Sequence, residues 1–231
     1  MATQFIDEDF VAVWRQQDLK DRLLTLAFGD EVEVLRQLAG WTEVRVLNYF
    51  DGTATGFIKG TPDLRDDGIV RVSMVDVQQG DGLILETPSG KIVFIDGGDN
   101  KLFARHAAAR FRHKQSSKAA PLEVDAIIVT HGDADHYSGL NDVKRSESLP
   151  STKARKRLFI KPKRVFSNGI VKVPSSVADK ERLGSTVVRN GTRYIVDLYD
   201  DPRAAPQGAL NVDFKQWNKT LDHWEQRGPI E

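Results

Sequence analysis

One short stretch, Val124 to Gly139, constrains the fold of this 231-residue chain more than any other. Its first half, Val124 to Thr130, is apolar and rich in β-branched residues, which predicts a strand buried on both faces. Four metal-capable side chains follow within six residues: His131, Asp133, Asp135 and His136. Ligand-binding groups favour the loop at the carboxyl end of a buried strand. The stretch therefore predicts an α/β domain with a metal-binding loop.

The spacing of these four side chains favours two ions over one. His131 and Asp133 are two residues apart, so in an extended segment they leave the backbone on the same side. Asp135 and His136 are adjacent and diverge, so each pair can bind a separate ion. Two-metal hydrolytic sites hold their ions roughly 4 Å apart. Imidazole suits zinc, iron and manganese, and carboxylates shift the preference toward harder ions.

A second block lies upstream, between Met74 and Gly98. It contains Gln79-Gly80-Asp81 and, after an apolar run, Ile95-Asp96-Gly97-Gly98. Together with His-x-Asp-x-Asp-His and the Tyr-Ser-Gly-Leu that follows it, this block resembles the metallo-β-lactamase superfamily. Asp133 stands where that family usually has His, and this form is similar to the hydrolase domain of ComEC-type DNA-uptake competence proteins and their soluble relatives. Gln78 departs from the Gly of those relatives, and the resemblance covers about Val70 to Leu140.

The resemblance implies a metallo-β-lactamase-like αββα sandwich, of which only the first half is recognisable. It implies two divalent metal ions, zinc or manganese, and a phosphodiester substrate such as DNA; cleavage of β-lactams or thioesters stays open because one fold serves many chemistries. Asp135 is the expected catalytic residue, because it would also orient the attacking hydroxide. Asp96 and Asp76 are expected to hold the metal ligands in position without binding the ions themselves. The implied metal ligands are His131, Asp133, Asp135 and His136.

The N-terminal region, residues 1–61, has a different pattern. Phe10, Val13 and Trp14 predict a short apolar helical face in an N-terminal arm. Between Gly29 and Gly60, apolar and polar residues alternate and Gly and Asp mark the turns, which predicts short antiparallel strands. This part resembles a bacterial SH3-like barrel, a class that binds peptides, cell-wall fragments or neighbouring domains. A polar linker at 61–68 leads to the hydrolase domain at 69–231, which diverges or carries an insertion from about residue 145.

Within the second domain, apolar runs predict strands at 69–77, 82–87 and 91–96, and the patterns predict helices at 102–111, from 138 to about 144, and at 214–225. A run of seven basic residues without an acidic one spans Ser151 to Arg164. Such a run can be a solvated face, or it can bind a polyanion through its phosphates. The candidates for phosphate or nucleic-acid contacts are Arg155, Lys156, Arg157, Lys161, Lys163 and Arg164.

Composition limits the other classes of function. The formal net charge is zero, so the chain as a whole offers no electrostatic case for nucleic acid or membrane. The absence of cysteine excludes thiolate metal sites and is compatible with a reducing cytosol. No apolar run approaches the roughly 20 residues that span a bilayer, and the N-terminus lacks the pattern of a signal peptide. A cytoplasmic protein without membrane contact is expected.

The ligand set is incomplete in this sequence. Each ion needs at least three protein groups, and only His223 follows His136, in a helical context that disfavours it as a ligand. We therefore expect that the natural protein continues past Glu231, or that another chain supplies the second half. The alternative is a lactamase-like scaffold without turnover, which would bind a peptide or protein partner through its SH3-like barrel.

Overall fold

The computed structural model describes residues 3–49, 52–174 and 185–231. It divides the chain into two compact units. The first comprises Met1–Arg71 with Glu86–Lys91 and Phe111–Gln115, and the second comprises Val72–Leu85, Ile92–Arg110 and Ser116–Glu231.

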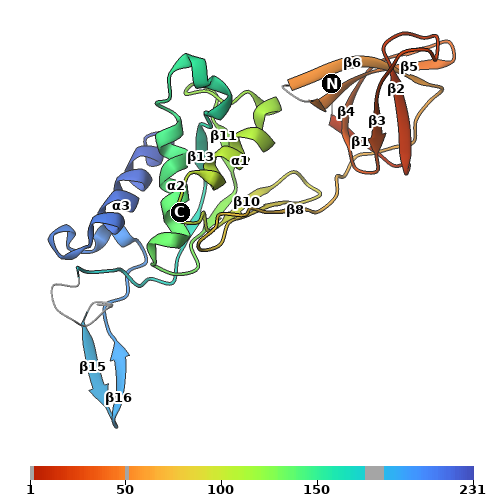
Figure 1. The fold of residues 1–231 in the computed structure, drawn as a ribbon. Helices are drawn as coiled ribbons and strands as arrows, with labels where there is room; N and C mark the ends of the chain where they lie inside the picture. The colour runs from red at the N-terminus through yellow and green to blue at the C-terminus, as the bar shows by residue number, and fades with distance from the viewer. Residues whose placement is uncertain (1–2, 50–51, 175–184) are drawn as a thin grey trace. The chain divides into compact units, whose positions relative to one another are not determined.

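The first unit is a curled antiparallel sheet of seven strands (Figure 1). Their order in space is β3-β2-β6-β5-β4-β1-β7. Alternating burial puts Ile6, Val13, Val32 and Val44 into one apolar core beneath the sheet. The strands are β1 (Thr3–Ile6), β2 (Phe10–Trp14), β3 (Arg22–Ala27), β4 (Glu31–Leu38), β5 (Trp41–Tyr49), β6 (Gly52–Lys59) and β7 (Leu64–Arg65).

The helical face predicted at Phe10, Val13 and Trp14 is wrong. These residues form β2, which pairs with β3 and β6. Val11 and Val13 are buried while Phe10 is largely exposed, so the burial period is two rather than 3.6. The N-terminal arm is therefore part of the sheet, and likeness to an SH3 barrel stays a prediction.

The second unit is built on a five-stranded sheet in the order β14-β12-β10-β9-β8. The strands β10, β12 and β14 run parallel, as the α/β prediction requires. Two small pairs stand apart from this sheet: β11 pairs with β13, and β15 pairs with β16. The strands are β8 (Arg71–Met74), β9 (Leu83–Glu86), β10 (Ile92–Ile95), β11 (Leu122–Val124), β12 (Ala126–Ile128), β13 (Ile160–Pro162), β14 (Val165–Phe166), β15 (Thr186–Arg189) and β16 (Thr192–Ile195).

Three helices pack in this unit, with α2 lying between α1 and α3 (Figure 1). The apolar faces of α2 and α3 meet around Tyr137, Trp217 and Trp224, all fully buried. Asn211 begins α3, because its side-chain oxygen accepts a hydrogen bond from the Phe214 N–H at 2.8 Å. The helices are α1 (Leu102–Arg110), α2 (Ala134–Ser146) and α3 (Val212–Glu225), with short 3₁₀ turns η1 (Arg112–Lys114), η2 (Ser151–Lys156), η3 (Pro202–Ala204) and η4 (Gln207–Ala209).

The helix after the metal motif begins earlier than predicted. It starts at Ala134 rather than at Ser138, with Asp133 in extended backbone at the N-cap position. Asp135 and His136 therefore lie in the first helical turn, and only His131 and Asp133 precede the helix. The assumption of one extended loop holds for the first pair alone.

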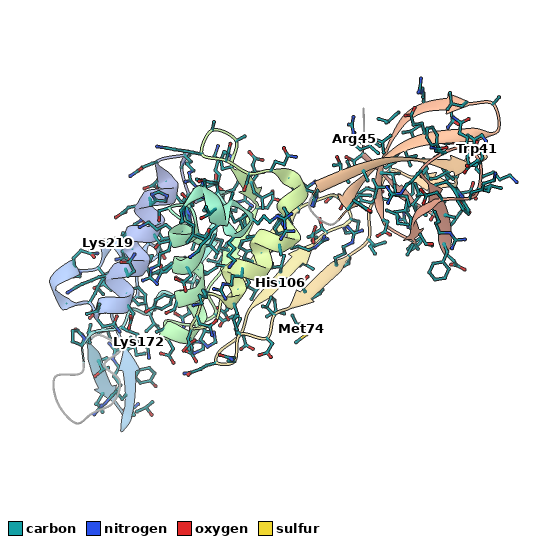
Figure 2. All side chains as sticks on the ribbon, turned by 45° about the horizontal axis from the view of Figure 1, so that its top comes forward. Trp41, Arg45, Met74, His106, Lys172 and Lys219 are labelled. Atoms are coloured by element: carbon teal, nitrogen blue, oxygen red, sulfur yellow. The ribbon has the colours of Figure 1, made fainter. Side chains whose placement is uncertain are left out.

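The two faces of the five-stranded sheet differ in how far other parts of the chain cover them. Phe94 and Ile127 are neighbours in the register and fully buried, and Phe103 of α1 packs on Phe94 with ring centroids 5.3 Å apart. On the opposite face, Ile128 is half-buried and its partner Phe166 is 52% exposed. Met74 of the edge strand β8, which is labelled in Figure 2, is 81% exposed. Among the described residues, Phe166 and Met74 of this sheet thus leave large apolar side chains in solvent. No helix among them has the length and apolar character needed to cross a bilayer.

Candidate metal centre

The centre begins where two parallel strands end side by side. Ile95 of β10 is in register with Ile128 of β12, so the residues that follow each strand meet. Asp96 adopts a left-handed backbone conformation, with φ of 53°, and is 1% exposed. Its Oδ1 accepts a hydrogen bond from the Thr130 N–H at 2.9 Å, and its Oδ2 accepts one from the Thr130 hydroxyl at 2.6 Å. The carboxylate therefore ties the two strand ends together.

His136 completes this arrangement from the first turn of α2. Its Nδ1 lies 2.9 Å from Asp96 Oδ2, and a carboxylate can only accept, so the Nδ1–H donates. This hydrogen bond fixes the orientation of the ring. Nε2 lies 3.8 Å from Asp135 Oδ1. We call Asp96, Thr130 and His136 the inner half of the centre.

The outer half consists of His131, Asp133 and Lys172. His131 Nε2 lies 3.3 Å from Asp133 Oδ2, and Lys172 Nζ lies 2.6 Å from Asp133 Oδ1. The His131 and Asp133 side chains are 45% and 37% exposed, whereas that of Lys172 is 13% exposed. The hydrogen bond from Lys172 holds the pKa of Asp133 below its usual value. The ring centroids of His131 and His136 are 3.7 Å apart, so the two halves are in contact.

Glycines bring the backbones around the centre unusually close. A Cβ atom at Gly139 of α2 would lie 1.8 Å from Gly97 O, and one at Gly80 would lie 1.8 Å from Asp135 O. The Gly97 N–H donates to His136 O at 2.7 Å, and the Gly139 N–H donates to Gly98 O at 2.9 Å. The loop after β10 is thus fastened to α2 by main-chain bonds, which no larger residue would permit.

The turn between β8 and β9 supplies a further candidate metal ligand, which the sequence had not indicated. Asp81, which is exposed, lies in the turn between β8 and β9. Asp81, Asp96 and His136 each offer one ligand atom, and these atoms lie within 4.8 Å of one another. Two carboxylates and an imidazole suit a divalent cation, and three protein groups are the usual minimum for one ion. The residues present therefore fit one ion at the inner half. The sequence feature that points to Asp81 is the glycine before it. Gly80 has a positive φ of 80°, and its backbone lies against that of Asp135.

The hydrogen bond that Asp76 accepts lies within its own turn and not among the four predicted ligands. It is exposed, and its Oδ1 accepts a hydrogen bond from the Gln78 N–H at 3.1 Å. A side chain that bonds the backbone two residues ahead stabilises a turn. Asp76 thus shapes the turn that carries Asp81, and its support of the centre passes through that turn.

The predicted basic run divides into two groups. Lys163 forms ion pairs with Glu123 at 3.0 Å and Asp125 at 3.1 Å, which raise the pKa of its ammonium. Arg164 pairs with Glu231 at 3.0 Å. Lys161 and Arg157 are partly buried, while Arg155 and Lys156 are exposed on η2. The strand part of the run is therefore largely neutralised, and the η2 part stays open to solvent.

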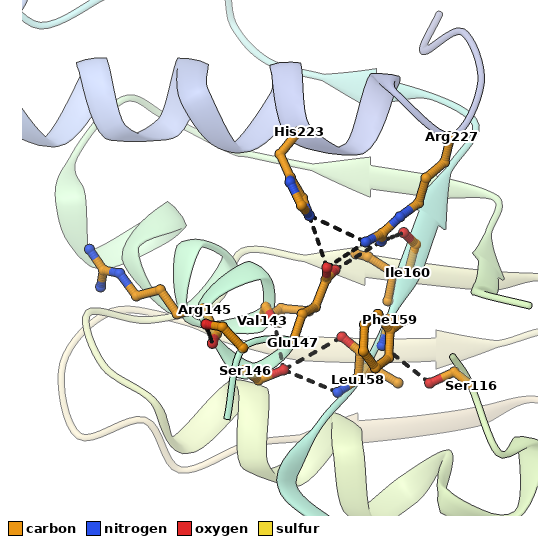
Figure 3. Close-up of polar contacts among 11 residues, drawn as sticks. Ser116, Val143, Arg145, Ser146, Glu147, Leu158, Phe159, Ile160, His223 and Arg227 are labelled. Atoms are coloured by element: carbon orange, nitrogen blue, oxygen red, sulfur yellow. Dashed lines mark hydrogen bonds and ion pairs between the residues drawn. The ribbon is translucent and has the colours of Figure 1, made fainter. Parts of the chain in front are cut away.

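His223 lies at the far end of α2 from the metal motif. Its Nε2 is 2.9 Å from a carboxylate oxygen of Glu147, the residue that ends α2 (Figure 3). Arg227 binds the same carboxylate, with Nη1 2.8 Å from Glu147 Oε1. This cluster joins α2 to α3, and it places His223 outside the candidate centre.

The part of the chain that holds the centre matches a known family. A model of the metallo-beta-lactamase superfamily matches residues 75–218, more than half of the chain. The match spans both predicted blocks, from the turn that carries Asp81 through the inner and outer halves and into α3. Comparisons with curated proteins and with solved structures gave no significant match. The chain belongs to the metallo-beta-lactamase superfamily.

Proposed function

We propose that the chain is a metal-dependent hydrolase that cleaves phosphodiester bonds in nucleic acids or nucleotides. The observation that carries the proposal is the convergence of Asp81, Asp96 and His136, whose donor atoms lie within 4.8 Å of one another. Two of these residues are buried, and Asp96 holds the His136 ring in place. Such a preorganised donor set binds an ion without reorganising at the moment of reaction.

A bound divalent ion would supply a Lewis acid and a nucleophilic hydroxide at neutral pH. The chain's own residues then have separate tasks. Asp135, 26% exposed and 3.8 Å from His136 Nε2, is placed to orient the attacking water by accepting its hydrogen bond. Asp96 fixes the orientation of the His136 ring. The half-exposed His131 leaves the outer half open to a substrate.

The number and identity of the ions are part of the proposal. The resemblance implies two ions, zinc or manganese, with His131, Asp133, Asp135 and His136 as ligands. Lys172 competes with the second ion, because its ammonium already forms an ion pair with Asp133. We expect the inner half to bind first and more tightly, and the outer half to accept a second ion only when Lys172 moves off Asp133.

The test is hydrolysis of a generic phosphodiester, bis(p-nitrophenyl) phosphate, by the chain loaded with zinc or manganese. Asp135→Asn keeps the shape of the side chain and removes its charge. We expect the rate to fall at least about a hundredfold, given the several kcal/mol that a metal centre supplies. Asp213→Asn, an exposed carboxylate on α3, is the matched control. Equal rates in Asp135→Asn and the parent chain would exclude the assigned role.

A second candidate function is a scaffold that binds a partner through the first unit. A hollow of about 380 Å³ lies in that unit. Among its lining residues, Arg71 donates to Glu31 at 2.8 Å, and Glu31 is 9% exposed. Such a hollow suits the binding of a peptide or protein partner, which is the role that the resemblance to an SH3-like barrel implies. Metal content separates the two functions: a hydrolase should bind metal and lose thermal stability in chelator, whereas a scaffold should bind none and keep its melting temperature.

A further inference from the structure

A second charged region lies away from the metal centre, in the second unit. A hollow of about 180 Å³ is formed by α1, the end of α2 and η2. Ala104, Ser146 and Leu149 form its less exposed lining. Five basic residues surround it: Lys101, Arg105, Arg145, Lys153 and Lys156.

The charge of this hollow is not balanced by the chain. Asp142 is the one carboxylate in the lining, and its Oδ1 accepts a hydrogen bond from Arg145 at 2.9 Å. Five positive charges and one negative charge leave a local excess of four, in a chain whose formal net charge is zero. No described acidic residue forms an ion pair with the other four basic side chains, all of which are exposed. Mutually repelling cations around one hollow are stabilised by a bound anion.

The elements that carry these cations are fixed by hydrogen bonds that are buried or partly buried. Ser146 Oγ accepts from the Leu158 N–H at 3.0 Å and donates to Val143 O at 2.7 Å, which ties the chain after η2 to the end of α2 (Figure 3). At the start of α1, Asn100 Oδ1 accepts a hydrogen bond from the Leu102 N–H at 2.8 Å. The backbone positions of the basic residues are therefore set by the fold before any ligand arrives.

The hollow and the metal centre lie along the same side of α2. Asp135 and Asp142 are seven residues apart, which is close to two helical turns. The distance along the axis is then about 10 Å at 1.5 Å per residue, or roughly three nucleotide steps at 3.4 Å of rise. One nucleic-acid strand can therefore reach from the hollow to the centre.

We propose that this hollow binds the phosphate backbone of a nucleic-acid strand and holds it for cleavage at the metal centre. No described residue of the lining is aromatic, so base stacking is absent there and contacts to phosphates carry the binding. The role in cleavage rests on the proposed function, whereas the binding of phosphates does not. The hollow should therefore bind without strong sequence preference.

The test is fluorescence anisotropy with a labelled single-stranded DNA 20-mer, in EDTA so that no hydrolysis occurs. Lys153→Gln combined with Lys156→Gln should weaken binding about tenfold at low salt. The slope of log K against log salt should flatten by about 1.4, at roughly 0.7 per lost phosphate contact on a single strand. Lys118→Gln combined with Lys219→Gln removes the same charge from exposed positions outside the hollow, and should leave binding within about twofold.

Equal weakening in both double variants would overturn the proposal, because it would show a diffuse response to net charge. Unchanged binding in Lys153→Gln/Lys156→Gln would overturn it as well. Inorganic pyrophosphate is the second probe: competition with DNA at equal affinity would assign the hollow to a small phosphate ligand and reject the strand.

Failure of the proposed function has a separate signature. A chain that binds DNA through the hollow but never hydrolyses bis(p-nitrophenyl) phosphate would retain the binding site and lose the catalytic assignment. The converse result, hydrolysis with no DNA binding by the parent chain, would remove the hollow's role alone.

Discussion

The inner and outer halves of the candidate centre share one short segment, His131 to His136, but they are stabilised in different ways. In the inner half, the buried Asp96 accepts hydrogen bonds from Thr130 and His136, which belong to the packed strand end and helix. In the outer half, the half-exposed Asp133 is satisfied by a second charge, that of Lys172. A carboxylate paired with a lysine ammonium must exchange that cation for a metal ion, and Asp96 has no such lysine among its hydrogen-bond partners in the described residues.

This difference indicates that the inner half is rigid and the outer half is adaptable. The inner half belongs to the packing between β10, β12 and α2, so changes there should affect folding and metal binding together. In the outer half the Asp133 side chain is 37% exposed, and an ion pair to so exposed a carboxylate contributes no more than about 1 kcal/mol. Changes there should affect metal binding and leave folding nearly intact.

The largest effect is expected at the glycines. Gly139→Ala places a Cβ 1.8 Å from Gly97 O, whereas Gly132→Ala, beside the outer half, meets Ile170 O at 3.0 Å. We expect Gly139→Ala to lower the free energy of unfolding by about 2 kcal/mol or more, despite the better helix propensity of Ala, and Gly132→Ala by less than about 1 kcal/mol. Urea unfolding measures both. Similar losses in the two variants would remove the distinction between the halves.

The next effect concerns the two carboxylates. Asp96→Asn tolerates the left-handed backbone but replaces one buried acceptor with a donor. We expect a loss of about 2 to 3 kcal/mol of stability together with loss of metal binding, because hydrogen bonds to a buried charge are among the stronger ones. Asp133→Asn should cost no more than about 1 kcal/mol. Thermal unfolding with and without zinc gives both quantities, and a more severe Asp133→Asn variant would reverse the comparison.

A smaller effect is expected at Lys172. Lys172→Gln removes the ammonium that competes with a metal ion for Asp133. We expect the affinity for a divalent ion to rise about threefold to tenfold, as one charge a few ångströms away requires in a high effective dielectric. Isothermal titration with manganese measures it, and Lys219→Gln on α3 is the control. Weaker binding in Lys172→Gln would show that the ammonium organises the outer half rather than blocking it.

The smallest effect is the response of the outer half to acid. Lys172 lowers the pKa of Asp133, so the stabilisation is complete above the ordinary carboxyl pKa and is lost as the pH falls through the lowered value. In Lys172→Gln the pKa of Asp133 should return toward 3.8, and the contribution should disappear. A carbon-detected NMR titration from about pH 5 downwards follows this carboxyl group directly. An unchanged Asp133 titration in the variant would exclude Lys172 as the cause.

The sequence predicted those parts of the fold that depend on local pattern. The helices at Leu102 and Phe214 were expected within two residues of their observed ends, because their apolar residues recur with the helical period. The start of α2 was placed too late, although an Asp before a helix is a common N-cap and Asp133 occupies that position. Phe10 to Trp14 was misassigned because five residues fit either period.

The candidate site was predictable only as far as the motif reached. His131, Asp133, Asp135 and His136 lie together because they are close in sequence, and Asp96 joins them through the parallel pairing of β10 and β12. Asp81 and Lys172 come from segments whose approach depends on long-range packing. No spacing rule indicates a lysine some forty residues after Asp133, so this contact required the folded chain.

The main-chain contacts at Gly80, Gly97 and Gly139 have a consequence for how such a site changes over evolutionary time. Because glycines position the loop, the identity of a donor side chain is nearly independent of the scaffold that presents it. A lineage can exchange one donor for another, such as imidazole for carboxylate at position 133, without rebuilding the loop. The same independence makes the centre a practical starting point for engineering metal selectivity, since donors can be varied while the three glycines are kept.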